Sequence, residues 1–385
     1  MTGLLVLSIL TLAASLWAAA EITIGLGRMH DLAEAEPFGG DNPPWLTVVV
    51  PACNEADSIE PALLSLLQQD YPYYEIIAVN DRSTDRTAEV LQSLQSQYPR
   101  LKVLTIRDLP DGWLGKNHAL HQGAELATGD YLLFTDADVV LEKTCLGRAM
   151  TVMMKDRLDH LCLLFKNSSP GSLLNALILD AGGGLLLLFR PWLAERPASR
   201  RFMGVGAFNL VRAASYRQIG GHELIRMHPI DDIMLGKLIK EEGLRQQCRL
   251  GYDFVSVPWY ETPRAMINGL MKNVFALYNF SVMKALTSAA LIVVAAILPP
   301  WGLLFGEGWA RFFFLLIIVA RLYLFGLGCR VMRLPYRLLA WSFLTPYLNL
   351  FIVVRATVLT LTHHGIEWRG THYPLARLRQ NRPLL

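Results

Sequence analysis

The sequence holds 385 residues, of which 52% are hydrophobic and only 18% are charged, so it is too apolar for a purely soluble protein. The net charge is only +3, and no Lys/Arg-rich block is interleaved with aromatic residues, which argues against nucleic acid as a partner. The five cysteines are odd in number and form no C-x-x-C pair, so the sequence predicts reduced thiols and excludes a disulfide framework or a zinc site.

The first predicted element is an apolar segment at the start of the chain. Residues 4–20 are uncharged and have roughly the length of a membrane span. Ala18-Ala19-Ala20 resembles a signal-peptidase site, but no Lys or Arg precedes the apolar run, which favours an uncleaved anchor over residues 1–26. Because Arg28 follows this segment, the positive-inside rule places the next part of the chain in the cytoplasm.

Residues 27–285 are predicted to form an α/β domain. Apolar, β-branched runs alternate with helical patterns, which predicts right-handed crossovers and a mostly parallel, Rossmann-like sheet. Asp57 or Ser58 is the predicted N-cap of the first helix, and Ser83 or Thr84 that of the second. The predicted strands are 46–52, the run that starts at residue 75 and leads into Asp81, 101–106 and 131–134.

The most informative polar residues follow the last of these strands. Asp136 and Asp138 end the apolar run YLLF with one residue between them, which places two carboxylates at the carboxyl edge of the sheet. Two hard oxygen donors there suit Mg²⁺ or Mn²⁺ bound to a diphosphate, although an acidic strand end has the same sequence pattern. Asn54 and Asp81, which follow two other strands, are expected at the same edge.

Another apolar stretch, residues 173–189, lies inside the α/β domain. Asp180 and the three glycines from Gly182 to Gly184 make it a poor membrane span. The stretch is therefore either a buried core helix or a segment in the membrane interface beside the active site.

Residues 286–361 are predicted to be a membrane region of two or three helices, with apolar stretches at 286–306, 312–328 and 338–361. Pro299-Pro300 is expected to break the first stretch and Pro346 the third. Arg321 lies near the middle of its stretch, where a charge requires a lipid phosphate or a buried partner.

The loop before the third apolar stretch and the tail after it are both basic. Arginines at 330, 333 and 337 predict a cytoplasmic loop, and residues 362–385 form a basic tail that also looks cytoplasmic. These two placements conflict with a third full span. Either stretch 338–361 is re-entrant or the tail is exported.

Several motifs occur in the order seen in one known family. They read VVVPACNE, VNDRSTD, GWLGKNHAL and LLFTDAD, followed by IDD at residues 230–232. Together they resemble the nucleotide-sugar half of family 2 glycosyltransferases, which have the GT-A fold. The apolar ends and the tail sequence GIEWRGTHYPL resemble the ceramide glucosyltransferase-like branch and the hopanoid-associated bacterial enzymes, and the resemblance covers nearly the whole chain.

The resemblance assigns donor-side roles to matching residues. Asp81 matches the aspartate that pairs with the uracil ring, and Lys116 matches a basic residue near the nucleotide. Asp136 and Asp138 match the metal and diphosphate motif, with Mn²⁺ or Mg²⁺ as the implied cofactor. The first loop, which in the family lies against the nucleoside, is matched by Pro51, Ala52, Asn54 and Glu55.

The resemblance also assigns the catalytic and acceptor-side residues. Asp232 matches the carboxylate that takes the proton of the acceptor in an inverting transfer, and Asp231 is the second choice. Two acids at the start of a helix also serve as caps. Gly206 and Asn209 in MGVGAFN match a loop on the acceptor side, where glycine lets the backbone approach a sugar.

The sequence departs from the family at the Q-x-x-R-W motif. Gln246 and Arg249 are present but the tryptophan is missing, which puts processive polymer synthesis in doubt. Trp259-Tyr260 follows a proline instead of an arginine, so the residues that close over the diphosphate are not identified.

The expected function is therefore transfer of a sugar from a nucleotide-diphosphate donor to a membrane lipid. The expected location is the inner or plasma membrane, with several passes and a cytoplasmic catalytic domain. A polysaccharide synthase of the same family, a catalytically silent protein that binds nucleotide-sugar or lipid, and a phosphotransferase are the alternatives. The sequence leaves open the sugar, the lipid, the choice between uracil and guanine, and the oligomeric state.

Overall fold

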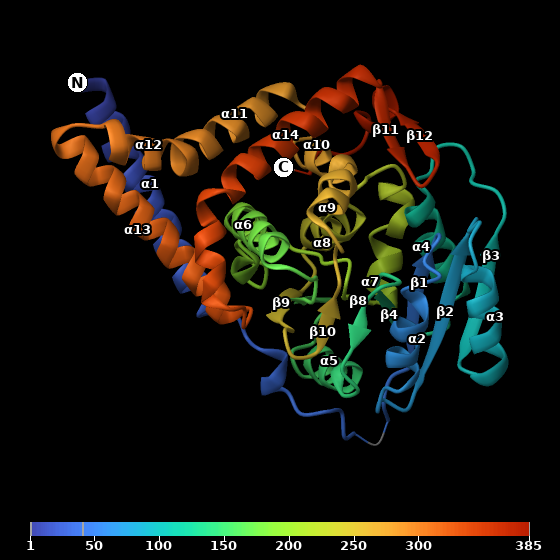
Figure 1. The fold of residues 1–385 in the computed structure, drawn as a ribbon. Helices are drawn as coiled ribbons and strands as arrows, with labels where there is room; N and C mark the ends of the chain where they lie inside the picture. The colour runs from blue at the N-terminus through green and yellow to red at the C-terminus, as the bar shows by residue number, and fades with distance from the viewer. Residues whose placement is uncertain (1, 41, 385) are drawn as a thin grey trace.

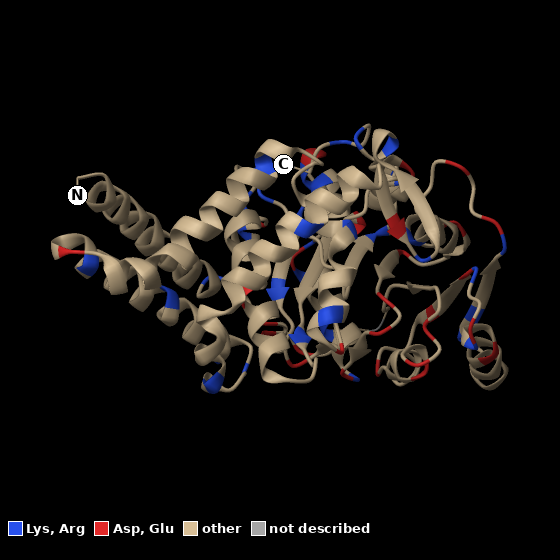
Figure 2. Ribbon diagram, turned by 45° about the horizontal axis from the view of Figure 1, so that its top comes forward, with Lys and Arg blue, Asp and Glu red and all other residues tan. Residues whose placement is uncertain are grey.

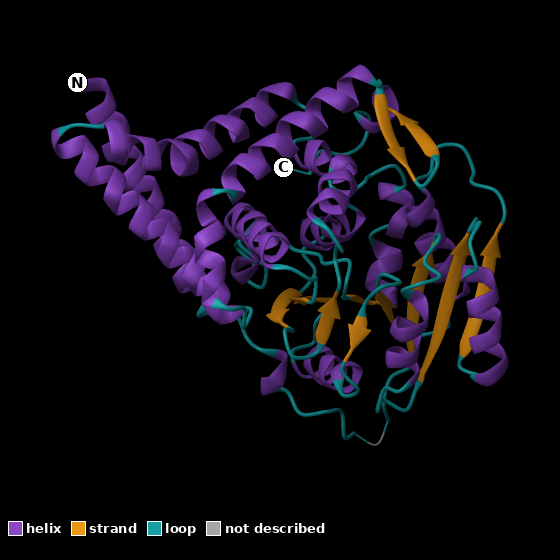
Figure 3. Cartoon of the chain, in the orientation of Figure 1, coloured by secondary structure: helices purple, strands orange, loops and turns teal. Residues whose placement is uncertain are grey.

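The computed structural model describes residues 2–40 and 42–384. An α/β domain occupies one half of the molecule, and long apolar helices project from it (Figure 1). In the described residues, the strands belong to the α/β domain, apart from a small hairpin near the C-terminus (Figure 3). The predicted class, an α/β domain with apolar helices at both ends of the chain, is confirmed.

The central sheet has seven strands in the order β3-β2-β1-β4-β8-β6-β9. The first four strands pair in parallel, while β8 pairs antiparallel with both β4 and β6, so the sheet is mixed but mostly parallel. The seven strands are β1 Leu46–Ala52, β2 Tyr74–Asp81, β3 Leu101–Ile106, β4 Tyr131–Phe134, β6 His160–Leu164, β8 Asn209–Arg212 and β9 Gln246–Leu250.

Strand β1 is buried because it lies between β2 and β4. Val48, Val49 and Val50 have no exposed surface, as expected for a parallel strand that is covered on both faces. Pairing with β4 ends at Val49, opposite Phe134, so the missing amide hydrogen of Pro51 costs the ladder nothing on that side. Strand β1 continues beyond this point to Ala52, paired with β2 alone, and this opens the sheet edge on the side of β4.

Helices of the α/β domain lie on both sides of the sheet, and α4 packs directly on β1 and β2. The predicted capping of the second helix is wrong. Helix α3 begins at Thr87, and Ser83 and Thr84 lie in the loop before it, where they bond to Asn54. The helices are α2 Ile59–Leu67, α3 Thr87–Gln97, α4 Gly115–Leu126, α5 Cys145–Lys155, α7 Ala213–Gln218, α8 Asp231–Glu241, α9 Pro263–Gly269 and α10 Met271–Leu277.

Within the described residues, five helical segments are long and apolar enough to cross a membrane. They carry few charged residues compared with the α/β domain (Figure 2). The segments are α1 Thr2–Leu26, α6 Ser172–Phe189 with the short turn η2 Pro191–Leu193, the pair α11 Val282–Ile292 and α12 Leu298–Phe305, α13 Gly308–Val331, and α14 Thr345–Thr362.

Neither of the two predicted proline breaks interrupts a helix in the structure. Pro299 and Pro300 lie in the first turn of α12, and a π-helical turn at Val293–Ile297 joins this helix to α11 without an interruption. Pro346 lies in the first turn of α14, where a missing amide hydrogen is tolerated, so it starts the helix instead of interrupting it. The stretch before it, Tyr336–Phe343, is the 3-10 helix η5.

The apolar helices pack in two groups. Helix α1 lies along α13, and α11 lies along α14, while α6 contacts η5, α14 and α13 (Figure 1). Arg321 of α13 donates to both oxygens of Asp180 in α6, at 2.9 and 3.0 Å, so its predicted partner is a protein carboxylate. Asn349 of α14 donates to the same carboxylate at 3.1 Å, which joins the three helices through one polar cluster.

The C-terminal tail folds back onto the α/β domain. Strands β11 Gly365–Trp368 and β12 Thr371–Pro374 form a hairpin at the end of α14, and the short helix α15 Leu375–Leu378 follows (Figure 1). Arg333, in the loop before η5, forms an ion pair with Asp253 of the α/β domain at 2.5 Å. The segments on both sides of α14 therefore contact the same domain.

Candidate active site

The candidate site lies at the carboxyl ends of β1, β2 and β4. Strand order runs outward from β1 through β2 to β3 on one side and from β1 to β4 on the other. Such a reversal leaves a crevice at the carboxyl edge of the sheet. At this edge the structure places Asp81, the last residue of β2, and Asn54, Asp136 and Asp138 in the loops after β1 and β4, as the sequence predicted.

The loop after β1 is bound to the loop after β2. Asn54 adopts a left-handed backbone conformation with φ of 57°, and its side-chain oxygen accepts from the amide of Thr84 at 2.7 Å. Its own amide donates to the hydroxyl of Ser83 at 3.0 Å. Glu55, next in the chain, forms an ion pair with Arg369 of the C-terminal hairpin. Asn54 therefore shapes the loop, while Pro51 and Ala52 remain part of β1.

Asp81 ends β2 and is buried, with 3% of its surface exposed. Arg82 donates to its two oxygens at 2.8 and 3.0 Å and also contacts the Thr371 hydroxyl at 3.5 Å. A Cβ on Gly115 would lie 2.4 Å from a carboxylate oxygen of Asp81, so only glycine lets α4 start this close. The carboxylate is thus fixed at the mouth of the crevice.

Asp136 and Asp138 occupy the loop after β4. The Thr135 hydroxyl donates to the carbonyl of Ala207 at 2.8 Å and ties this loop to the loop before β8. The pKa of Asp138 is raised to about 7, mainly by burial and also by the negative charges of Asp136 and Glu55. The structure gives Asp138 no salt bridge within the described residues.

These two carboxylates fit the requirements of a divalent metal bound to a diphosphate. Mg²⁺ and Mn²⁺ take oxygen ligands, and Mg²⁺ in phosphate sites uses one or two carboxylates and completes its shell with phosphate and water. The described part of the chain has no cluster of three or more His, Cys, Asp or Glu side chains suited to a metal. A metal here would therefore depend on the phosphate groups of a ligand.

Lys116 links the loop after β4, which carries Asp136 and Asp138, to the acidic pair Asp231 and Asp232. Its ammonium lies 2.7 Å from Asp136 and 3.4 Å from Asp231. Burial alone would lower the pKa of Lys116, but the charges of Asp136, Asp231 and Asp232 raise it above its usual value. Asn117 donates to the carbonyls of Ile225 and His228, at 2.8 and 3.0 Å, which fixes the start of α4 against the segment before the acidic pair.

Asp231 and Asp232 lie in the first turn of α8. The N-cap residue of this helix is Ile230, so neither carboxylate occupies the N-cap position. Asp232 accepts from the amide of Gly206 and from the amide of Ile233, both at 2.8 Å. The pKa of Asp232 is raised to about 6, mainly by burial and also by the charge of Asp231. Asp231 instead faces the ammonium of Lys116.

Glycines hold the loop before β8 against α8. A Cβ on Gly204 would lie 1.8 Å from the carbonyl oxygen of Asp232, so the two backbones are in direct contact. A Cβ on Gly206 would lie 2.8 Å from Asp136 and 3.4 Å from Asp232, which places this glycine between the two carboxylates. Asn209 is buried in β8 and donates to the carbonyl of Asp232 at 3.2 Å, so it supports the helix start.

The carboxylates around Lys116 share one small cavity. It brings together residues that are more than a hundred positions apart in the sequence. Its lining includes the predicted base, Asp232, and Asp136 of the loop after β4. The residues that line it are Lys116, Leu120, Phe134, Thr135, Asp136, Gly206, Asn209, His222, Asp231 and Asp232.

The histidines near the acidic pair are buried and neutral. Burial lowers the pKa of His222 to about 3 and that of His228 to about 4. His222 is bonded to the hydroxyl of Tyr216 at 2.7 Å, and His228 accepts from the amide of Ile230 at 3.2 Å. Both therefore support the local structure and carry no positive charge into the crevice.

Gln246 and Arg249, the remnants of the Q-x-x-R-W pattern, lie in β9 and not over the crevice. Gln246 accepts from the amide of Met203 at 2.9 Å and donates to the carbonyl of Gly236 at 2.7 Å, which braces the glycine loop against α8. Arg249 forms an ion pair with Asp156 at 2.8 Å. Their roles in this structure are therefore structural.

Several residues to which the sequence patterns assigned no role approach the site from the loop before α9, from α10 and from the tail. The pKa of Tyr260 is raised by burial and by the charge of Asp138, which places its ring near that carboxylate. Lys272 of α10 lies over the ring of Trp368 at 3.4 Å, and Tyr373 accepts from the amide of Gly115 at 3.2 Å. The concentration of aromatic and basic residues in GIEWRGTHYPL was the available signal.

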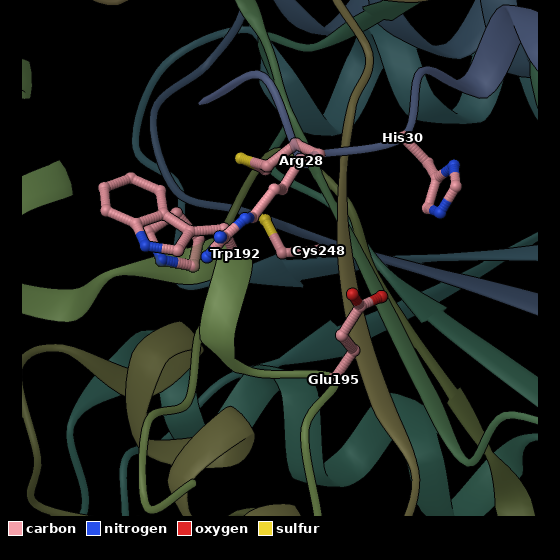
Figure 4. Close-up of a pocket in the computed structure, with 7 residues that line it drawn as sticks. Arg28, His30, Trp192, Glu195 and Cys248 are labelled. Atoms are coloured by element: carbon pink, nitrogen blue, oxygen red, sulfur yellow. The ribbon is translucent and has the colours of Figure 1, made fainter. Parts of the chain in front are cut away.

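A separate pocket lies between the end of α1 and β9 (Figure 4). Its labelled side chains are Arg28, His30, Trp192, Glu195 and Cys248. It shares no lining residue with the carboxylate cavity. Because it contains neither paired carboxylates nor a cluster of cations, it offers no comparable chemistry.

Comparison with known proteins agrees with this geometry. Residues 47–219 match the model described as "Glycosyl transferase family 2". A 4,4'-diaponeurosporenoate glycosyltransferase of Staphylococcus aureus (strain USA300) is 27% identical over 241 residues, which cover 56% of each chain. The match thus spans a little over half the length of that relative.

A solved structure shares the fold. It is the mannosyltransferase PcManGT from Pyrobaculum calidifontis in complex with GDP-Man and Mn²⁺, with a TM-score of 0.55 and 18% sequence identity. The similarity covers 93% of this chain and 98% of the other. The crevice, its carboxylates and the matched segment therefore identify residues 47–219 as a family 2 glycosyltransferase domain with the GT-A fold.

Proposed function

We propose that the protein is an inverting glycosyltransferase that moves a sugar from a nucleoside diphosphate to a membrane lipid. The observation that carries this proposal is the meeting of Asp136, Asp231 and Asp232 around Lys116 in one cavity at the sheet edge. A scaffold that only bound lipid would have no use for this excess of buried negative charge, which is costly unless a cation or a reaction requires it.

On the donor side, Asp136 and Asp138 would hold Mn²⁺ or Mg²⁺ together with the diphosphate. The metal would neutralise charge that develops on the leaving diphosphate. Pro51, Ala52, Asn54, Glu55 and Asp81 surround the space for the nucleoside, with Asp81 as the acceptor for an N–H of the base. Both uracil and guanine present such a group, so UDP and GDP sugars are the two candidates.

Asp232 is a better base than Asp231 for two reasons. Asp231 lies 3.4 Å from the ammonium of Lys116, so its carboxylate is already engaged in an ion pair. The pKa of Asp232 is raised to about 6 by burial and by Asp231, which is close to the operating pH of an effective general base. Asp232 would take the proton of the acceptor hydroxyl as that oxygen attacks the sugar from the face opposite the diphosphate.

On the acceptor side, the arrangement of the apolar helices supports a lipid substrate. The matched Staphylococcus aureus relative is named for a carotenoid acid, which is a lipid-like acceptor. Gly206 and Asn209 lie at the acidic pair, so an acceptor that reaches Asp232 passes Gly206. Because the apolar helices border the same domain, a membrane lipid can approach without leaving the bilayer surface.

The contacts of α14 favour the re-entrant alternative for this helix. Arg355, in its middle, donates to Asn268 of α9 at 3.1 Å, and the helix also packs on α10. The segments before and after it contact the α/β domain through Arg333 and Arg369. An 18-residue helix that returns to the same domain at both ends leaves the tail on the cytoplasmic side.

We therefore propose three spans, formed by α1, the pair α11–α12 and α13, with the catalytic domain in the cytoplasm. Helix α6 begins and ends in the catalytic domain and would lie at the membrane interface with α14. This arrangement modifies the expected domain division, in which residues 1–26 and 286–361 were membrane segments, 27–285 the catalytic domain and 362–385 a tail. The proposed arrangement of spans is tested by a tag fused after the tail. Protease access to this tag is compared between intact spheroplasts and inverted vesicles.

The proposed reaction is tested with membranes that contain the protein and a panel of radiolabelled UDP and GDP sugars. Label in an extractable lipid supports the proposal, and label in a polymer would support a polysaccharide synthase instead. Binding of donor without any transfer would point to a silent binding protein. The Asp232→Asn variant in the same membranes is the control for background enzymes.

A further inference from the structure

Lys272 is a cation near the crevice that has no carboxylate partner in the described part of the chain. It lies on α10, is half-buried, and its ammonium is 3.4 Å from the ring centroid of Trp368. The indole ring attracts the ammonium but carries no negative charge that would neutralise it. Such a group can still bind an anion.

The charged groups of the carboxylate cavity act on Lys272. The pKa of Lys272 is lowered to about 7, mainly by burial and also by the charge of Lys116, while Asp231 and Asp136 act in the opposite direction. Arg369 also acts on it. Lys272 is not among the residues that line the cavity, but it lies within electrostatic range of Lys116 and Asp136 and contacts Trp368 of the C-terminal hairpin.

The C-terminal hairpin that carries Trp368 is fastened to the donor loops at separate points. Arg369 binds Glu55 and the carbonyl of Asn54, after β1. Thr371 contacts Arg82, after β2, and the hydroxyl of Tyr373 accepts from the amide of Gly115, directly before Lys116. The hairpin thus joins the loops that frame the donor space and holds an indole against Lys272.

We propose that Lys272 is a second cation for the diphosphate of the donor, and that Trp368 of the C-terminal hairpin is its positioning residue. This inference rests on the proposed function. It assigns a task to the tail sequence GIEWRGTHYPL, and it supplies a cation over the phosphates in a chain without Q-x-x-R-W. The donor diphosphate is favoured over a lipid phosphate because the hairpin is bound to donor loops.

The test measures the affinity of the purified full-length protein for UDP and GDP, and for uridine and guanosine, with Mn²⁺ present. Lys272→Met should weaken binding of the nucleoside diphosphate about tenfold to a hundredfold, because a charge-assisted hydrogen bond is lost. Binding of the matching nucleoside should not change. Lys272→Arg should keep most of the affinity, and Lys155→Met, at an exposed lysine of α5, is the matched control.

Trp368→Leu tests the positioning role. It should weaken binding of the diphosphate about threefold to thirtyfold, which is the range of a cation–π contact, and leave nucleoside binding unchanged. In the Lys272→Met background the same substitution should have no further effect on the diphosphate. Additive losses would show that Trp368 acts independently of Lys272 and would overturn the positioning role.

Other outcomes separate this inference from the proposed function. If the unaltered protein binds neither UDP nor GDP, the donor assignment itself fails. If it binds one of them and Lys272→Met binds it equally well, only the role of Lys272 is overturned. An equal loss of diphosphate and nucleoside binding in Lys272→Met would indicate structural damage and would overturn the role of Lys272 at the diphosphate. A change confined to the KM for the lipid acceptor would also overturn this role.

Discussion

The crevice and the apolar helices each hold a cluster of carboxylates and cations. In the crevice, Lys116 faces Asp136 and Asp231, and Asp138 and Asp232 add further acidic groups. Among the helices, Asp180 and Arg321 balance each other, and Asn349 donates to the same carboxylate. The first cluster carries excess negative charge, and the second carries none.

This difference separates a reactive site from a structural one. An excess of buried carboxylates raises the pKa of some of them and creates a place for a metal ion and a proton acceptor. A balanced pair with its hydrogen bonds satisfied joins helices in an apolar environment without attracting a ligand. Substitutions in the two clusters should therefore affect different measurements, catalysis in the first and stability in the second.

The largest effect on catalysis is expected from Asp232→Asn. Removal of the base should lower kcat about a hundredfold to ten-thousandfold, since general base catalysis contributes by that amount. Donor affinity should stay close to that of the unaltered protein. Steady-state kinetics with the radiolabelled donor and lipid extraction measure both quantities.

Asp231→Asn is the matched control for that variant. It removes a partner of Lys116, so it should weaken donor binding more than it slows turnover. If Asp231→Asn abolishes turnover while Asp232→Asn remains active, the base must be reassigned to Asp231.

A smaller loss is expected from Asp138→Ala. The variant removes one of the two carboxylates suited to the metal, and loss of a charged ligand should weaken Mn²⁺-dependent donor binding about tenfold to a hundredfold. Titration of nucleoside diphosphate at several Mn²⁺ concentrations measures the change. Asp108→Ala, at an exposed loop carboxylate, is the control, and an unchanged Mn²⁺ dependence in Asp138→Ala would exclude the metal role.

The pH dependence of turnover should show the raised pKa of Asp232. Because the base must be ionised, the rate should be constant above about pH 7 and fall below the pKa of about 6. One pH unit below that value, about a tenfold loss is expected. A profile of kcat between pH 5 and 8, at saturating donor, measures it, and a rate that stays level down to pH 5 would contradict the assignment.

The smallest effect on catalysis is expected from Arg321→Met. The variant leaves Asp180 without its cation, and the free energy of unfolding in detergent should fall by about 1–2 kcal/mol. Turnover per folded molecule should not change. Combining Arg321→Met with Asp180→Leu should restore part of the lost stability, because neither charge then remains buried. A loss of turnover in the folded single variant would show that this cluster belongs to the substrate path.

The sequence predicted much of the α/β half. The bounds of β1, β3 and β4 match the predicted runs, because buried parallel strands are continuous apolar segments bounded by polar loops. The placement of Asn54, Asp81 and Asp136 at one edge followed from the topology of alternating strands and helices. Helix caps were less predictable, since Ser83 and Thr84 bond to Asn54 of another loop instead of to the helix that follows.

Other features depended on contacts between distant residues. The pairing of Asp180 with Arg321 joins positions 141 residues apart, and the hairpin that binds the donor loops through Arg369 crosses 314 positions. No local pattern fixes such contacts, because they depend on how complete helices and strands pack. The re-entrant course proposed for α14 likewise rests on its contacts with the catalytic domain, whereas its composition resembles that of a span.

By itself the sequence determined the strand-and-helix alternation, the apolar segments and the identity of the acidic residues, because periodicity and residue chemistry are local properties. The tertiary structure alone decided that Lys116 lies between Asp136 and Asp231, and that Trp368 lies against Lys272. The physical reason is that electrostatic environment and burial arise only when separate segments are packed together.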